Sequence, residues 1–161
     1  MRYLIFRGKD LDTSEWVYGD LLHAIEYDPK TRQGKMTDGC IIYEKGEKDD
    51  GFVCRSVDVF PTSIGAYTGL KDKNGKQIFE GDIVTRYDNY FKTTEIGVVV
   101  FNGIDASFCI SVEEYGLTVL YHFLPREDYN DGHCLIQIKY TFEVIGNVFD
   151  NPDLLKPKNG E

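Results

Sequence analysis

The length, composition and charge of the chain exclude several classes of protein. Its 161 residues, 42% of them hydrophobic, suit one or two globular domains and argue against global disorder. The 18 basic and 27 acidic side chains give a formal net charge of −9, which opposes non-specific binding to nucleic-acid phosphates. An aromatic share of 14% together with 16 Gly favours strands and turns over helices. Composition by itself points to no activity.

The acidic charge is unevenly distributed. Residues 1–60 hold 9 basic and 12 acidic side chains (net −3), and residues 61–161 hold 9 and 15 (net −6). Within the second part, residues 103–134 contain six acidic side chains and Arg126 as the one basic side chain (net −5). This segment is interpreted either as a solvated acidic face or as a surface that meets a basic partner.

Targeting signals and cysteines indicate a cytoplasmic protein. The apolar stretch at residues 3–6 is shorter than the roughly 7–15 residues of a secretory h-region. Runs such as residues 98–101 fall far short of the roughly 20 residues that span a bilayer. The four cysteines form no C-x-x-C pair, and we expect reduced thiols rather than disulfides. They are Cys40, Cys54, Cys109 and Cys134.

Short β-type runs separated by turn residues recur along the chain. Trp16, Tyr18 and Leu22 fall at even spacing and therefore share one face of a strand. Residues 28–39 are rich in turn formers, and residues 44–51 are expected to form an exposed loop. The predicted strands cover residues 3–6, 15–22, 40–43, 52–60, 83–87, 95–102, 108–112, 117–123 and 135–150. This spacing predicts an all-β barrel or sandwich.

Turn chemistry is strongest between residues 69 and 84. Asn74-Gly75 predicts a tight type I′ hairpin turn, and Gly81-Asp82 predicts a second turn into the next strand. Asp72 and Asp82 are expected to accept hydrogen bonds from turn amides.

The C-terminal run carries two further local signals. Gly146 predicts a bulge or bend in the last strand. Asn151-Pro152 predicts one helical turn, with Asn151 as N-cap and Pro152 in the first position.

Three segments of the chain resemble one family. The long motif from Val59 to Val84 is similar to the signature of the YopX family, small proteins encoded in bacteriophages and prophages. Residues 6–9 with 15–21, and residues 142–155, resemble its N- and C-terminal patterns. The resemblance implies an SH3-like β-barrel in the C-terminal part and a bacterial host cytoplasm. It brings no established activity and no catalytic residue.

The chain is expected to divide near residues 60–68, where Pro61 and Gly65 interrupt the strand pattern. We predict an N-terminal β lobe over residues 1–62 and an SH3-like β-barrel lobe over residues 63–150. Residues 151–161 are predicted to form a short C-terminal turn and a polar tail.

No catalytic or metal-binding constellation is found, so we predict no enzyme, no cofactor and no metal. There is no G-x-S-x-G elbow and no phosphate-binding loop. Two alternatives are a soft metal site among Cys109, His122, His133 and Cys134, and a thiol–imidazole pair of Cys109 with His122 or His133. A third is an enzyme whose pocket holds two or more of Cys109, His122, His133 and Glu143. Acidic pairs at residues 113–114 and 127–128 could in principle hold a divalent cation, although solvated charge explains them better.

The main hypothesis is a non-enzymatic protein that acts through protein–protein contacts. Its partner is a second copy of itself or an unidentified host or phage protein. The hairpin at residues 83–100 is expected to offer a pairing surface for a homo-oligomer. The alternative is a nucleic-acid-binding module. It would use a hairpin of interleaved cations and aromatic rings: Arg86, Tyr87, Tyr90, Phe91 and Lys92.

Overall fold

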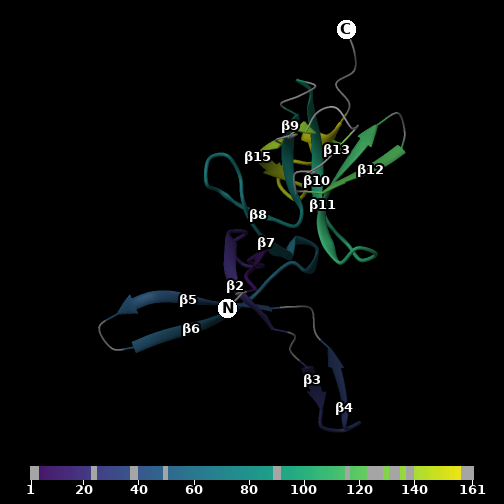
Figure 1. Cartoon of the computed structure of the whole chain (residues 1–161). Coiled ribbons are helices and arrows are strands. Elements are labelled where there is room, and N and C mark those ends of the chain that lie inside the picture. The colour runs from purple at the N-terminus through teal and green to yellow at the C-terminus, as the bar shows by residue number, and fades with distance from the viewer. Residues whose placement is uncertain are drawn as a thin grey trace. The chain divides into compact units, whose positions relative to one another are not determined.

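The computed structural model confirms the all-β prediction. It describes residues 4–22, 25–36, 40–48, 51–88, 92–114, 117–122, 129–130, 135–136 and 140–156. These residues form fifteen strands and two short 3-10 helices, with no α-helix (Figure 1). Neither helix in this described part has the length and apolar character that a membrane crossing requires.

The chain divides into two compact units, Met1–Tyr67 and Thr68–Glu161. The division falls inside the interval of residues 60–68 in which the sequence pattern breaks. The 3-10 helix η1 (Pro61–Ser63) begins at Pro61, and the strand β7 (Gly65–Lys71) then leads from the first unit into the second. Each unit has its own cluster of buried apolar residues.

The first unit contributes to a six-stranded sheet with the order β6-β5-β2-β1-β7-β8, whose last strand belongs to the second unit. Val57 and Val59 are the buried core residues of the first unit. Its strands are β1 (Phe6–Lys9), β2 (Trp16–Leu22), β5 (Cys40–Lys48), β6 (Gly51–Asp58) and the start of β7, with a separate hairpin of β3 (Ile25–Asp28) and β4 (Gln33–Met36). The partly buried residues packed on the core are Phe6, Val17, Leu21 and Ile64. Val17 and Leu21 alternate with Trp16, Tyr18 and Leu22, which therefore lie on the other face of β2.

Two expectations for the first unit are wrong. The first strand begins at Phe6 rather than residue 3 and continues to Lys9. Residues 44–48 and 51, expected to lie in a loop, instead belong to the paired strands β5 and β6, with a register shift between Lys45 and Lys48, while residues 49 and 50 lie outside the described part. Polar composition indicates exposure to solvent, whereas the hydrogen bonds of a hairpin join backbone groups and need no apolar side chain.

The second unit contains a five-stranded antiparallel sheet with the order β12-β11-β10-β9-β15. The strands that follow β7 are β8 (Gln77–Phe79), β9 (Asp82–Asp88), β10 (Thr94–Asn102), β11 (Ser107–Glu114), β12 (Leu117–His122), β13 (Tyr129–Asn130), β14 (Leu135–Ile136) and β15 (Tyr140–Asn147). The buried core consists of Ile78, Val84, Val99, Ile110, Val112 and Val144, with Phe108 and Phe142 packed against it. The alternation along β9, β10, β11 and β15 brings their core residues to one face of this sheet, and Ile78 is contributed by β8.

The described strands of the hairpin at residues 83–100 are not edges of the sheet, so the self-association predicted there, which stays a prediction, would not add a strand to either of them. β9 pairs with β10 and also with β15, and β10 pairs with β9 and also with β11. Both strands are therefore interior. In the described sheet the end positions belong to β12 and β15. A sequence can indicate a hairpin, but the neighbours that later flank it come from distant segments such as β15.

Gly146 marks the bulge that the sequence predicts. The register of β15 on β9 shifts between Val144 and Gly146. A Cβ atom at Gly146 would lie 2.7 Å from Oδ1 of Asn151 and 2.8 Å from Cδ1 of Leu154. A side chain at this position would have to displace the side chains of Asn151 and Leu154, because the chain that follows β15 folds back onto Gly146.

Candidate functional site

Arg86 is not the exposed cation that the nucleic-acid hypothesis uses. The residue is only 5% exposed, and its guanidinium forms an ion pair and hydrogen bond with Glu95 on the neighbouring strand β10. Cross-strand register places the two residues opposite one another. Its charge is thus already matched by a carboxylate within the sheet.

The described part of the structure does not bring the other four residues of the nucleic-acid hypothesis together on one surface. Tyr87 is half-buried and follows Arg86 in β9, so the two side chains lie on opposite faces of the sheet. Lys92 is exposed and adopts a φ of 58°. Tyr90 and Phe91 lie outside the described residues.

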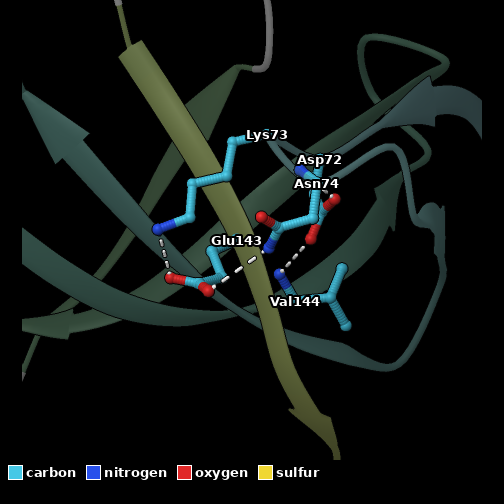
Figure 2. A network of polar contacts seen from close by, with 5 residues as sticks. All are labelled: Asp72, Lys73, Asn74, Glu143 and Val144. Atoms are coloured by element: carbon cyan, nitrogen blue, oxygen red, sulfur yellow. Dashed lines mark hydrogen bonds and ion pairs between the residues drawn. The ribbon is translucent and has the colours of Figure 1, made fainter.

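A network of polar contacts joins the β7–β8 loop to β15 (Figure 2). Asp72 is buried, and one of its carboxylate oxygens accepts hydrogen bonds from the backbone N–H groups of Asn74 (2.8 Å) and Lys76 (2.9 Å). The other oxygen accepts a hydrogen bond from the backbone N–H of Val144, at 3.1 Å, although Val144 lies 72 residues away in the sequence. One side chain thus shapes the turn and attaches it to a distant strand.

The expected role of Asp72 as an acceptor of turn amides is confirmed, but the expected turn type is wrong. A type I′ turn needs positive φ at both central residues. Gly75 has a φ of 82°, whereas Asn74 is not among the residues with positive φ. The backbone N–H of Gly75 instead donates to the carbonyl of Asp72 at 3.0 Å, which places Gly75 at the end of a four-residue turn.

Glu143 strengthens the attachment from the side of β15. One carboxylate oxygen pairs with Nζ of Lys73 at 2.6 Å, and the other accepts a hydrogen bond from Nδ2 of Asn74 at 3.4 Å. The backbone N–H of Lys73 also donates to the carbonyl of Phe142 at 2.9 Å. Figure 2 shows these side chains converging on β15. Glu143 therefore takes part in holding the loop.

The pKa values follow from this geometry. Burial alone would raise the pKa of Asp72, but hydrogen bonds from the N–H groups of Val144, Lys76 and Asn74 outweigh burial and hold the pKa below its ordinary 3.8. The hydrogen bond from Lys73 lowers the pKa of Glu143. Both carboxylates are kept ionised, which suits acceptors and opposes any role as a general acid near neutral pH.

Asp82 acts in a second turn, as the sequence predicts. It is buried, and its Oδ2 accepts a hydrogen bond from the backbone N–H of Phe79 at 2.8 Å. Gly81, which precedes it, has a φ of 80° and forms backbone hydrogen bonds with Val99 and Val148. These two residues therefore connect β8 with β9 and tie that turn to the rest of the sheet.

Trp16 in the first unit lies next to two cations from β1, Arg7 and Lys9. The guanidinium carbon of Arg7 lies 4.6 Å from the centroid of the indole ring, and Nζ of Lys9 lies 5.7 Å from it. The register of β1 on β2 places Lys9 opposite Trp16 and Arg7 opposite Tyr18. Residues two apart in a strand share a face, so the spacing of Arg7 and Lys9 was a usable signal.

Of the remaining candidates for catalysis or metal binding, the described strands bring Cys109 and His122 opposite one another and gather no larger group. Cys109 is buried, and its sulfur lies 3.7 Å from Oγ of Ser107. The register pairs Cys109 with His122 across β11 and β12, while His133 and Cys134 lie outside the described residues. Among the described residues no group of three or more His, Cys, Asp or Glu side chains is arranged to hold a metal ion.

The segment that follows β15 forms a hydrogen-bonded turn, which we call the C-terminal turn (residues 147–156). Oδ1 of Asn147 accepts hydrogen bonds from the backbone N–H groups of Phe149 (3.0 Å) and Asp150 (2.8 Å). The 3-10 helix η2 (Pro152–Leu155) follows, with Pro in its first turn as predicted. Asn151 precedes η2 but forms no side-chain cap, because its Oδ1 accepts a hydrogen bond from the backbone N–H of Asn147 instead.

Four apolar side chains of the C-terminal turn remain well exposed. Each retains between 38% and 41% of its accessible surface: Val148, Phe149, Leu154 and Leu155. The hydrogen bonds of Asn147 and Asn151 fix the backbone that carries them. We take this turn as a candidate contact surface for another protein.

Comparisons with known proteins identify a family but no activity. The family model described as "YopX protein" matches residues 5–156. No curated protein matches the chain. Among solved structures, the chain is similar to one described as protein EF1440 from Enterococcus faecalis. The match has 24% sequence identity and a TM-score of 0.45, and it covers 96% of this chain and 99% of that one.

Proposed function

Since the chain belongs to the YopX family, we propose that it is a phage- or prophage-derived protein that acts without catalysis, through protein–protein contacts in the cytoplasm of a bacterial host. The partner is a second copy of the chain or a host or phage protein. The observation that carries the proposal is the C-terminal turn, which holds four partly exposed apolar side chains on a hydrogen-bonded backbone.

A non-enzymatic role is supported by the polar side chains of the second unit, which bind other groups of the same unit. The carboxylates of Asp72 and Glu143 and the guanidinium of Arg86 all bind groups within the second unit. Asp82 closes a turn. Side chains that would serve as acids, bases or anion binders in an enzyme here serve the fold.

An SH3-like barrel remains our proposal for the second unit. Its support is the strand order, in which β9, β10, β11 and β12 form a meander and β15 returns beside β9. The all-β, antiparallel architecture is already established by the strand pairing.

Affinity capture from prophage-induced cells tests the function. The bait is the full chain, read by mass spectrometry with and without nuclease treatment. A variant with Phe149→Ser and Leu155→Ser is compared with Ile104→Ser, which removes an apolar side chain that is 94% exposed in a loop. We expect the wild type and the Ile104→Ser control to capture the same protein. The double variant should no longer capture it, and nuclease treatment should not change its capture by the wild type.

Two results would overturn the proposal. Capture that disappears after nuclease treatment would favour the nucleic-acid alternative. Capture that survives the double variant unchanged would show that the C-terminal turn is not the contact surface.

A further inference from the structure

We propose that the loop between β10 and β11 is a self-modifying site, in which Asn102 deamidates by attack of the backbone nitrogen of Gly103. The proposal is independent of the proposed function. The described residues contain the pair Asn-Gly twice, at residues 74–75 and at residues 102–103. A glycine after asparagine leaves the following backbone nitrogen unhindered, so the sequence by itself makes the two pairs similarly reactive. The hydrogen bonds of the folded chain distinguish them.

The reaction needs water as its one co-reactant. The nitrogen of Gly103 forms a bond to Cγ of Asn102, and the bond from Cγ to Nδ2 breaks. The amide proton of Gly103 passes to solvent base, while the departing nitrogen gains a proton and leaves as ammonia. Water then opens the cyclic imide. Cleavage between the nitrogen and Cγ gives aspartate at position 102, and cleavage between the nitrogen and the backbone carbonyl carbon gives isoaspartate.

The side chain of Asn102 is folded forward over the residues that follow it. Its Oδ1 accepts a hydrogen bond from the backbone N–H of Ile104 at 3.0 Å, and its Nδ2 donates to Oδ2 of Asp105 at 2.8 Å. Both partners lie beyond Gly103 in the chain, so the carboxamide is held close to the peptide that contains the nucleophile. A reacting group that is already held near its nucleophile pays less entropy to reach the transition state.

The same two contacts match the charges that develop during the attack. When Cγ becomes tetrahedral, Oδ1 of Asn102 becomes an oxyanion, and the N–H of Ile104 already donates to it. Nδ2 becomes a positively charged ammonium group before it leaves, and the carboxylate of Asp105 is its neighbour. Both contacts are therefore stronger in the transition state than in the ground state, which accelerates the reaction.

The turn at residues 74–75 opposes the same attack. The backbone N–H of Gly75 donates to the carbonyl of Asp72 at 3.0 Å, so the nucleophile must first leave this hydrogen bond. The carboxamide of Asn74 donates to Glu143 on β15 at 3.4 Å, and is thus directed to another strand and not along its own turn (Figure 2). Space does not separate the two pairs, because nothing lies within 4 Å of the Cβ position of either glycine.

Deamidation changes the end of the β10–β11 hairpin. Asn102 pairs with Ser107 in the last position of the β10–β11 register, and residues 103–106 are exposed, so water reaches the loop. The product carries a carboxylate where Nδ2 donated to Asp105, and the attraction between the two side chains becomes repulsion. Isoaspartate also lengthens the backbone by one methylene group. The loop therefore acquires a more acidic and less well-paired form as the protein ages.

Ageing of the full chain in mildly alkaline buffer, followed by peptide mass mapping, tests the proposal. In the folded wild type we expect Asn102 to deamidate about tenfold faster than Asn74, because hydrogen bonds at Asn74 and Gly75 must be broken first. Enzymatic methylation of isoaspartyl groups should label position 102. In urea that unfolds the chain, the two rates should come within about threefold of each other, because the contacts that separate them are lost.

Two variants separate the chemistry from its surroundings. Gly103→Ala adds a Cβ atom in open space, so the fold is kept while the attack is hindered. No isoaspartate should then form at position 102 over the same period. Asp105→Ala removes the carboxylate beside the leaving nitrogen and should slow deamidation of Asn102 about threefold. Asp153→Ala, at another exposed carboxylate, is the matched control and should leave the rate unchanged.

Three results would overturn the proposal. Equal rates at the two Asn-Gly pairs of the folded chain would show that the fold does not select between them. A difference between the two rates that persists in urea would assign the selection to the local sequence. Deamidation of Asn102 that continues unchanged in Gly103→Ala or in Asp105→Ala would exclude the attack or the surroundings described here.

Discussion

The carboxylate of Asp72 stabilises both its own turn and the attachment of that turn to β15, because it accepts hydrogen bonds from backbone N–H groups of each. Asp72→Asn keeps the shape of the side chain but removes its charge and one acceptor oxygen. We expect the free energy of unfolding to fall by about 2 kcal/mol, because backbone N–H groups lose a charged partner. Urea denaturation measures it. Asp153→Asn, which breaks an exposed ion pair with Lys156, should change stability by less than about 0.5 kcal/mol. Equal losses for the two variants would contradict this role of Asp72.

The depressed pKa values of single carboxylates also predict acid sensitivity. Asp10 accepts hydrogen bonds from the N–H groups of Asp12 and Thr13, which lower its pKa below 3.8, and the pKa of Asp72 is lowered likewise. A carboxyl whose pKa is lowered on folding stabilises the protein fully above its unfolded pKa. That stabilisation is lost as the pH falls through the folded pKa. We therefore expect the urea concentration at the unfolding midpoint to decrease as the pH drops below about 4. In Asp72→Asn this decrease with pH should be less steep than in the wild type. An identical pH dependence in the variant would exclude Asp72 as a source.

At the scale of a single strand, β10 depends on a glycine that packs closely against β11. A Cβ atom at Gly97 would lie 2.5 Å from the carbonyl oxygen of Ser111 and 2.6 Å from a methyl group of Ile110. Because backbone atoms cannot move aside cheaply, we expect Gly97→Ala to lower the free energy of unfolding by about 3 kcal/mol. Gly103→Ala is the control, since nothing lies within 4 Å of its Cβ position, and it should cost less than about 0.5 kcal/mol. Thermal or urea denaturation compares the two variants, and similar costs would argue against close packing at Gly97.

At the scale of the whole molecule, two separate cores predict two separable unfolding events. Trp16 is the one tryptophan of the chain and lies in the first unit, so its fluorescence reports on that unit. Ile110→Ala creates a cavity in the second core and should lower the midpoint seen by circular dichroism, at a cost of about 2–5 kcal/mol, with little effect on Trp16 fluorescence. Val59→Ala, in the first core, should shift the fluorescence midpoint. Coincident shifts by both probes would show that the units unfold as one.

Local patterns were enough to predict much of the fold. The alternation of apolar residues and the turn residues predicted the all-β class, the bulge at Gly146, the acceptor roles of Asp72 and Asp82, and Pro152 at the start of η2. Each of these depends on residues within a few positions of one another, where backbone geometry and side-chain hydrogen bonding act directly.

The sequence by itself therefore determined the strands, the turns and the family, because these follow from local alternation, turn chemistry and a long motif. Only the tertiary structure decided that Arg86 is buried against Glu95, that Asp72 binds Val144, that β9 and β10 are interior, and that β12 and β15 end the sheet. The physical reason is that strand order and burial arise from contacts between segments far apart in the chain, and the sequence of one strand does not specify which strand becomes its neighbour.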